Sequence, residues 1–223
     1  MTVRPSQRAT NVAYYSQNRA KEIARVQRRQ AATLAFLRDL RRRPCTDCRK
    51  VLQPHQMDFD HREPMRKAFR LTSGRAMLKS RAALLDEASK CDVVCANCHR
   101  MRTSAHKRRL DGSSGGASRY LKRKRHQWRS HAELLNALRD VPCADCGHRY
   151  APCVMDFDHR DPNAKRNTVT RMIGRAGTAR ILDEVAKCDI VCANCHRART
   201  FDRRMTANAG GSSSVGRARP FQG

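Results

Sequence analysis

Aromatic residues and long apolar runs are both scarce in this 223-residue chain. Phe, Trp and Tyr make up 5% of it, and the mean hydropathy is −0.76. Such a chain cannot bury a large core, and domains of under about 80 residues commonly add metal ions or disulfides. No run is apolar enough for a transmembrane helix, and the polar, basic N-terminal stretch lacks the features of a secretory signal. We therefore expect a cytoplasmic protein with no membrane partner.

Acidic residues are also few. The chain has 20 Asp and Glu against 47 Lys and Arg, which gives a formal net charge of +27. A positive excess of this size raises the local concentration of polyanions, and nucleic acid is the usual one. The composition thus favours a nucleic-acid partner over a small neutral substrate. The alternative is a basic surface that only keeps the chain soluble.

Cysteine, in contrast, is abundant, and most of the 11 residues fall in a block that occurs twice. Each block has a Cys-x-x-Cys pair, then Met-Asp-Phe-Asp-His-Arg, then Lys-Cys-Asp-x-Val-Cys-Ala-Asn-Cys-His-Arg. His61 and His159 are 98 positions apart, whereas Cys95 and Cys192 are 97 apart. The one-residue difference predicts a loop that tolerates length changes between the two motifs.

Each block supplies the ligands for one closed, tetrahedral zinc site. In a reducing compartment, paired Cys-x-x-Cys motifs bind zinc far more often than they form disulfides. The predicted structural zinc ligands are Cys45, Cys48, Cys95 and Cys98 in the first block, and Cys143, Cys146, Cys192 and Cys195 in the second. We interpret Cys91 and Cys188 as small buried residues rather than alternative ligands, and Cys153 as a free thiol. Arg49 stands where the second block has Gly147, so we expect a less regular first loop.

Periodicity and punctuation predict the organisation of the chain. Residues 11–41 have a helical apolar stripe with Arg and Lys on the other face, which favours a DNA-binding arm over a helix that packs on the first repeat. Residues 57–60 alternate as a strand should, and 82–90, 97–108, 180–187 and 194–204 read as helices. The predicted segments are an N-terminal arm (1–33), a first module (34–109), a flexible basic linker (110–130), a second module (131–204) and a disordered tail (205–223).

Each block also has an Asp-His pair and a Cys-His pair that a four-thiolate zinc site does not need. One carboxylate and one imidazole can hold a divalent cation and leave positions for water and phosphate. A second histidine, whose ordinary pKa is near neutrality, can act as a general base. The alternative is that these histidines are surface residues or only support the zinc site. Their recurrence in both copies argues against that alternative.

With these motifs the chain resembles the HNH (ββα-metal) endonuclease superfamily, in the phage and bacterial branch with four zinc thiolates. The resemblance covers about residues 34–109 and 131–204. It implies two α+β zinc modules in tandem with basic helical arms, Mg²⁺ or Mn²⁺ as the catalytic cation, and double-stranded DNA as partner. It implies cation ligands at Asp60, His99, Asp158 and His196, and general bases at His61 and His159. It also implies a bacterial or phage-infected host.

Basic residues beside the motifs are candidates for phosphate contacts. They are Arg62, Lys67, Arg100 and Arg102 in the first repeat, and Arg160, Lys165, Arg197 and Arg199 in the second. One departure from the family is that no Asn lies just before the second thiolate pair. Asn97 and Asn194 could take over its orienting role or could simply begin a helix.

The leading hypothesis is a DNA endonuclease with two active sites, able to nick or to cut both strands. A non-catalytic, zinc-dependent nucleic-acid-binding protein is the alternative, and a nuclease acting on RNA is a weaker one because the chain offers few stacking residues. Protein partners are not indicated by any motif.

Overall fold

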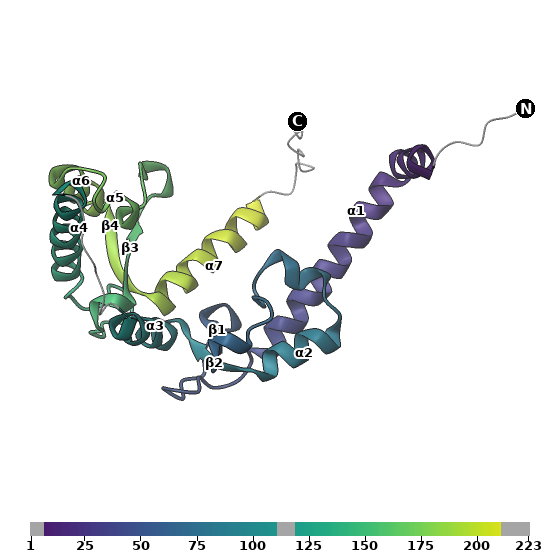
Figure 1. The fold of residues 1–223 in the computed structure, drawn as a ribbon, viewed down its shortest axis with the longest axis horizontal. Helices are drawn as coiled ribbons and strands as arrows, with labels where there is room; N and C mark the ends of the chain where they lie inside the picture. The colour runs from purple at the N-terminus through teal and green to yellow at the C-terminus, as the bar shows by residue number, and fades with distance from the viewer. Residues whose placement is uncertain (1–6, 111–118, 211–223) are drawn as a thin grey trace, which may run out of the picture. The chain divides into compact units, whose positions relative to one another are not determined.

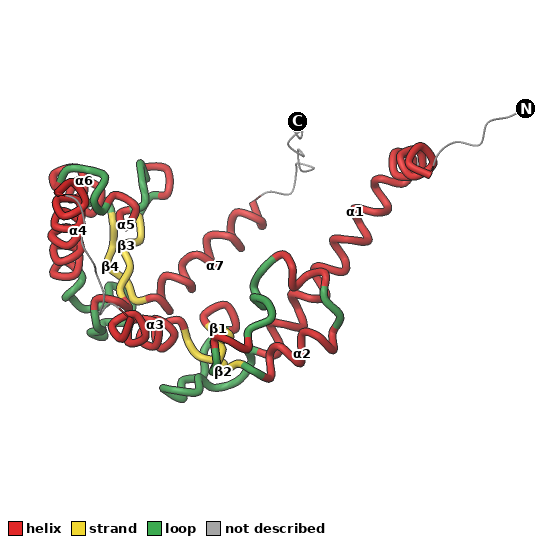
Figure 2. The backbone as a smooth tube through the Cα atoms, in the orientation of Figure 1, coloured by secondary structure: helices red, strands yellow, loops and turns green. Residues whose placement is uncertain are grey.

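The computed structural model describes residues 7–110 and 119–210, which form an α+β structure as predicted. Helices make up most of it, and its strands form two small two-stranded sheets (Figure 2). Contacts between Cα atoms divide the chain into two compact units, residues 1–94 and 95–223, so the boundary falls within the second strand. We describe each unit separately.

The first unit begins with helix α1 (Gln7–Leu40), which confirms the predicted basic helix and extends it. The segment has no Pro or Gly, and Pro44 follows its end. Only the C-terminal part of its apolar stripe is buried: Leu37 is 1% exposed, whereas Leu34 is 52% exposed. Figure 1 shows the N-terminal half of α1 extending away from the other elements of this unit. Most of the stripe therefore does not pack on the first repeat.

The rest of the first unit consists of short elements. Strand β1 (Met57–His61) pairs with β2 (Cys91–Cys95), and helix α2 (Arg81–Ser89) lies between them in sequence. Three 3₁₀ turns, η1 (Pro54–Gln56), η2 (Pro64–Arg66) and η3 (Gly74–Leu78), occupy the connections. The Ser80 hydroxyl caps α2 by accepting a hydrogen bond from the Ala83 N–H.

The second unit contains the second repeat and also helix α3 (Ala96–Leu110), the last helix of the first repeat. Helix α4 (Arg119–Leu138) is followed by η4 (Pro152–Val154), β3 (Met155–His159) and η5 (Pro162–Ala164). Helices α5 (Val169–Met172) and α6 (Thr178–Val185), strand β4 (Cys188–Cys192) and helix α7 (Ala193–Gly210) complete it. Strands β3 and β4 are antiparallel, with Met155 opposite Cys192 and His159 opposite Cys188.

Equivalent residues build the main core of each repeat. In the first, Leu37, Leu84 and Cys91 are buried together, with Phe59 packed against them. In the second, Leu135, Ile181 and Cys188 are buried in the same way, with Phe157 beside them. Figure 1 shows α4, α5 and α6 gathered beside the β3–β4 sheet, the elements that supply this core. Cys91 and Cys188 are thus the small buried residues that the sequence predicted.

Two boundaries differ from the sequence-based expectation. Residues 119–130, predicted as part of a flexible linker, belong to α4, because the stretch contains no Pro or Gly to end a helix. Helix α7 continues to Gly210, past residue 205 where we expected the tail to begin. Residues 111–118 and 211–223, the rest of those two segments, lie outside the described residues. The pattern also gave no assignment for the second strand of each sheet.

No helix in the described part of the chain is both long and apolar enough to cross a membrane.

Leu37 and Leu34 provide a matched test of the first core. We expect Leu37→Ala to lower the free energy of unfolding by about 2–5 kcal/mol, since it leaves a cavity in a packed core. Leu34→Ala, on the same helix, should change it by less than about 0.5 kcal/mol because the side chain is exposed. Chemical denaturation followed by circular dichroism measures both. Equal losses would contradict the packing described here.

Candidate metal centres and the site beside them

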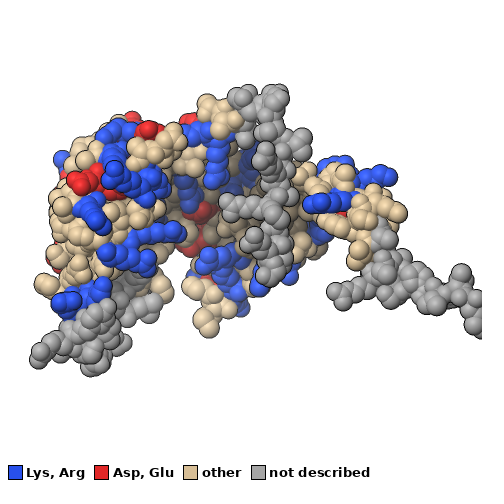
Figure 3. Space-filling model, turned by 90° about the horizontal axis from the view of Figure 1, so that it is seen from above, with Lys and Arg blue, Asp and Glu red and all other residues tan. Residues whose placement is uncertain are grey.

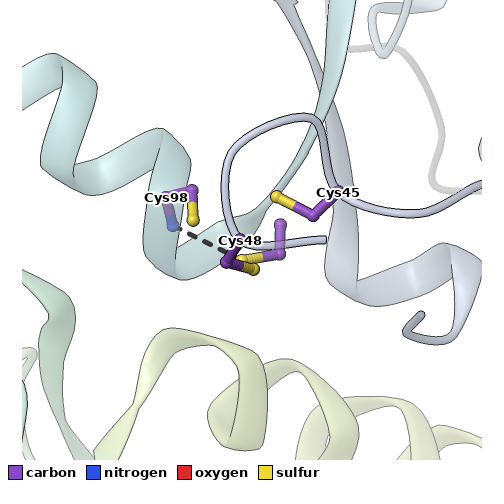
Figure 4. Close-up of side chains that lie close together, drawn as sticks. Cys45, Cys48 and Cys98 are labelled. Atoms are coloured by element: carbon purple, nitrogen blue, oxygen red, sulfur yellow. Dashed lines mark hydrogen bonds between the residues drawn. The ribbon is translucent and has the colours of Figure 1, made fainter. Parts of the chain in front are cut away.

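Two groups of four cysteines have the geometry of structural zinc sites. In each group the Sγ atoms all lie within 4.8 Å of one another, and the members are the eight cysteines predicted from the sequence. Four sulfurs at about 2.3 Å from one zinc ion stand about 3.8 Å apart in a tetrahedron, so the ligands fit that ion. Figure 4 shows Cys45 and Cys48 on a loop and Cys98 on the first turn of α3, with their sulfur atoms gathered together.

Backbone N–H groups support the sulfur atoms. The Cys98 N–H donates to Cys95 Sγ at 3.5 Å, and the Cys192 N–H donates to Cys143 Sγ at 3.2 Å. Burial raises the pKa of Cys143, but N–H donors from Cys146, Cys192 and Asp145 outweigh it and lower the pKa to about 7. A hydrogen bond to the charged form favours that form, so Cys143 is the thiol of its group that most readily becomes a thiolate, whereas burial raises the pKa of Cys192 and Cys195.

The loops that carry the first cysteine pair of each group have the same hydrogen bonds. Arg49 N–H donates to Cys45 O at 3.0 Å, and Gly147 N–H donates to Cys143 O at 2.9 Å. Both residues have positive φ, 60° for Arg49 and 70° for Gly147. The expectation of a less regular first loop is therefore wrong for the backbone hydrogen bonds. The absence of glycine instead places Arg49 in the left-handed region of backbone conformation, which is unfavourable for a residue with a side chain.

In both repeats the predicted general base is bound to a buried glutamate. His61 Nε2 lies 2.8 Å from Glu87 Oε1, and His159 Nε2 lies 2.8 Å from Glu184 Oε1. The glutamate side chains are 0% and 3% exposed, and both histidine side chains are 7% exposed. An ionised carboxylate only accepts hydrogen bonds, so Nε2 carries the proton and Nδ1 has the lone pair when the ring is neutral.

Each glutamate is kept ionised by several donors. Burial raises the pKa of Glu87, but hydrogen bonds from His61, Lys90, Phe69 N–H and Ala68 N–H outweigh it and lower the pKa to about 2. Burial also raises the pKa of Glu184, and Lys187, Asn167 N–H, His159 and Arg166 N–H lower it to about 2 in the same way. Both repeats thus give the histidine the same partner, an ionised glutamate.

The second repeat brings four predicted site residues into one pocket. Asp158 and His159 at the end of β3 and His196 on the first turn of α7 line an open cavity of about 290 Å³, together with Lys165, Thr200 and Arg203. His196 Nε2 is 3.5 Å from Asp158 Oδ1. His196 Nδ1 is 2.7 Å from Asp156 Oδ2. The imidazole therefore stands between two carboxylates that project from the same face of β3.

Two arginines contact the Asp158 carboxylate, whose side chain is 5% exposed. Arg203 donates to both oxygens, at 2.9 and 2.7 Å, and Arg199 donates to Oδ2 at 3.1 Å. Burial raises the pKa of Asp158, but these guanidinium groups, with Arg203 first, outweigh it and the pKa is lowered. The position equivalent to Arg203 in the first repeat, 97 residues earlier, is His106.

In the first repeat, Asp60 is half-buried on β1 and His99 is half-buried on the first turn of α3. His61 is at the end of β1 and contacts Glu87, as described above.

The predicted phosphate contacts fall into different environments. Arg62 and Arg160 each tie the end of a strand to the segment before the next one: Arg62 contacts Ser89 O and Cys91 O, and Arg160 contacts Ala186 O and Cys188 O. Arg199 contacts Asp145 and Asp189 as well as Asp158.

The other predicted contacts differ in their exposure. Lys67 and Lys165 are exposed, and Arg102 and Arg197 are half-buried on α3 and α7. Arg100, also on α3, pairs with Asp156.

Asn97 and Asn194 join two helices. Each N–H donates to the side-chain Oδ1 of the other residue, at 3.3 Å for Asn97 N–H and 2.9 Å for Asn194 N–H. Both lie in the first turn, where N–H groups have no partner within their own helix. Each asparagine therefore caps the other helix, a role outside the two alternatives that the sequence left open.

Sequence reasoning missed Glu87, Glu184 and Asp156. A signal for the glutamates was present, because Asp-Glu-x-x-Lys-Cys-Asp occurs in both repeats with Glu four residues before the buried cysteine. A signal for Asp156 was the two-residue spacing from Asp158 on a predicted strand.

No family model, curated protein or solved structure matches this chain.

Metal content tests the two cysteine groups. We expect the purified chain to hold two zinc ions and Cys146→Ser to hold one, because the serine hydroxyl is a poor zinc ligand. Cys153→Ser is the control, since Cys153 is exposed and belongs to neither group, and it should keep both ions. Elemental analysis of dialysed protein gives the ratio. Retention of two zinc ions by Cys146→Ser would argue against the second centre.

The left-handed loop position gives a second prediction with opposite signs in the two repeats. Gly147→Ala should lower the free energy of unfolding by about 1 kcal/mol, because its surroundings are open and only the positive φ opposes a side chain. Arg49→Gly should raise it by about 0.5–1 kcal/mol, since it relieves the same strain at some cost in chain entropy. Denaturant titration of the zinc-loaded protein measures both, and a loss for Arg49→Gly would refute the argument.

Proposed function

We propose that this protein is a metal-dependent HNH endonuclease that hydrolyses DNA phosphodiester bonds, with one site in each repeat. The observation that supports it most is the pocket of the second repeat, where Asp158, His159 and His196 line one cavity. A structural zinc site needs none of these three side chains. The recurrence of the same residues in the first repeat adds to the case.

The pair of His159 and Glu184 is suited to general-base catalysis. Glu184 accepts a hydrogen bond from Nε2–H, which fixes the ring and leaves Nδ1 to take a proton from water. The negative charge of Glu184 also stabilises the imidazolium that forms. This arrangement has the logic of a nucleophile, a base and an orienting carboxylate, with water as the nucleophile.

Asp158 and His196 are suited to hold a divalent cation. Their closest oxygen and nitrogen are 3.5 Å apart, near the roughly 3.0 Å that adjacent ligands have around an octahedral Mg²⁺ with bonds of about 2.1 Å. Asp156 binds the other ring nitrogen of His196, the support that metal-binding histidines usually have. When bound, the cation would supply positive charge to the phosphate and to the departing oxygen.

Basic residues at the pocket would bind the phosphate. Arg203 and Lys165 both line the cavity, and an entering phosphate offers the Arg203 guanidinium a second partner besides Asp158. On the face seen in Figure 3, Lys and Arg cover far more of the surface than Asp and Glu. A surface of this kind attracts DNA over a distance.

The reaction is written for the second repeat as a hydrolysis. The water oxygen forms a bond to phosphorus while its proton passes to His159 Nδ1. The bond from phosphorus to the 3′ oxygen breaks, and that oxygen takes a proton from solvent. The products are a 3′ hydroxyl and a 5′ phosphate. His61 and Glu87 would act in the same way in the first repeat.

One observation favours a second candidate, a zinc-dependent DNA-binding protein without catalysis. Arg203 and Arg199 already neutralise Asp158, so this carboxylate does not require a cation to be stable. In that case the pocket would bind phosphate through the same arginines and leave the bond intact.

Cleavage of supercoiled plasmid in Mg²⁺ or Mn²⁺ distinguishes the two candidates. We expect the wild type, with two working sites, to linearise the plasmid. His61→Ala and His159→Ala should each keep one site and only nick it, and the double variant should be inactive. Loss of a general base costs about 10²–10⁴ in rate. His126→Ala, an exposed histidine on α4 outside both sites, is the matched control and should cut normally.

The same protein samples are tested for DNA binding by gel shift. Binding without cleavage by the wild type in either metal would refute the endonuclease and support the second candidate. Full activity in the double variant would show that these histidines are not the bases.

A further inference from the structure

We propose that Arg100, from the first repeat, positions the cation site of the second repeat through Asp156 and His196. The inference rests on the proposed function, because it concerns the site at which Asp158 and His196 would hold a cation. It assigns to Arg100 a role that differs from contact with DNA phosphate.

Three side chains form a continuous chain of short contacts. Arg100 donates to both oxygens of Asp156, each at 2.7 Å. Asp156 Oδ2 in turn lies 2.7 Å from His196 Nδ1. Two-point contact between a guanidinium and a carboxylate fixes the direction as well as the distance, which a single-point lysine contact would not do.

The Asp156 carboxylate can in turn orient the His196 ring. Its side chain is 18% exposed and contacts both the Arg100 guanidinium and the His196 ring. A carboxylate paired with a guanidinium accepts a hydrogen bond from Nδ1–H, so in the neutral ring Nε2 has the lone pair and faces Asp158 Oδ1. The tautomer that can bind a cation is therefore selected by Asp156, and Arg100 holds Asp156 in place.

The backbone around Arg100 is itself anchored in the second unit. Helix α3 packs on η4 and on α7, and the reciprocal bonds of Asn97 and Asn194 join the first turns of α3 and α7 (Figure 1). Arg100 also donates to Val154 O at 3.4 Å, in the turn that leads into β3. A packed helix thus holds Arg100 beside Asp156, so the second site includes a residue from outside its own repeat.

The test uses the full-length, zinc-loaded chain with Asp60→Asn, which removes a candidate cation ligand of the first repeat. Mn²⁺ binding is measured by electron paramagnetic resonance, and the ring nitrogens of His196 are observed by ¹⁵N NMR without Mn²⁺. We expect Asp156→Asn to weaken Mn²⁺ binding by about 10–100-fold and Arg100→Ala by about tenfold. The Mn²⁺ affinity of Arg100→Lys should lie between that of Arg100→Ala and that of the parent, the chain that carries Asp60→Asn alone.

The control is Arg204→Ala, an exposed arginine on α7 with the same loss of charge, which should bind Mn²⁺ like the parent. In NMR, Arg100→Ala should shift His196 from a single Nδ1–H tautomer to a mixture, with unchanged zinc content showing that the fold persists. An unchanged tautomer and unchanged affinity in Arg100→Ala would overturn the inference. Absence of Mn²⁺ binding in the parent would overturn the proposed cation site instead, and the NMR comparison would still judge the chain of contacts.

Discussion

In each repeat, four cysteine sulfur atoms lie together where a loop meets the junction between a strand and a helix, and the position of the candidate site depends on this cluster. The strands have only five residues each, and an isolated two-stranded sheet is marginal in water. Helices α3 and α7 begin directly after the third cysteine, so the cysteine cluster sets the positions of His99 and His196. A metal ion bound by these cysteines would thus stabilise a chain whose composition cannot supply a large core.

Charge is distributed unevenly between the surface and the site. The chain has an excess of Lys and Arg, yet several of its 20 acidic residues are gathered inside or beside the second pocket. Glu184 holds a histidine, Asp156 holds another, and Asp158 faces the cavity. In the proposed function, the basic surface would attract DNA, and the local acidic group would hold a cation and a polarised water.

The sequence predicted the parts whose chemistry depends on a local pattern. The zinc ligands, the strand at residues 57–60 and most of the longer helices followed from spacing and alternation, and the structure confirms their positions. The glutamate partners of His61 and His159 recur in both repeats, but no local pattern pairs them with the histidines, because they come from a helix 25 or more residues away. The pairing of Arg100 with Asp156 spans 56 residues and depends on how α3 packs, which no local pattern encodes.

The reciprocal contact of Asn97 and Asn194 has the form seen in a symmetric dimer, where residue i of one copy meets residue j of the other and the reverse. In a dimer of identical chains, one mutation changes both sides of such a contact. Here the two sides are encoded by separate codons. The contact can therefore persist while the surroundings diverge, as at Arg203 and its counterpart His106, so one gene can evolve two unequal sites.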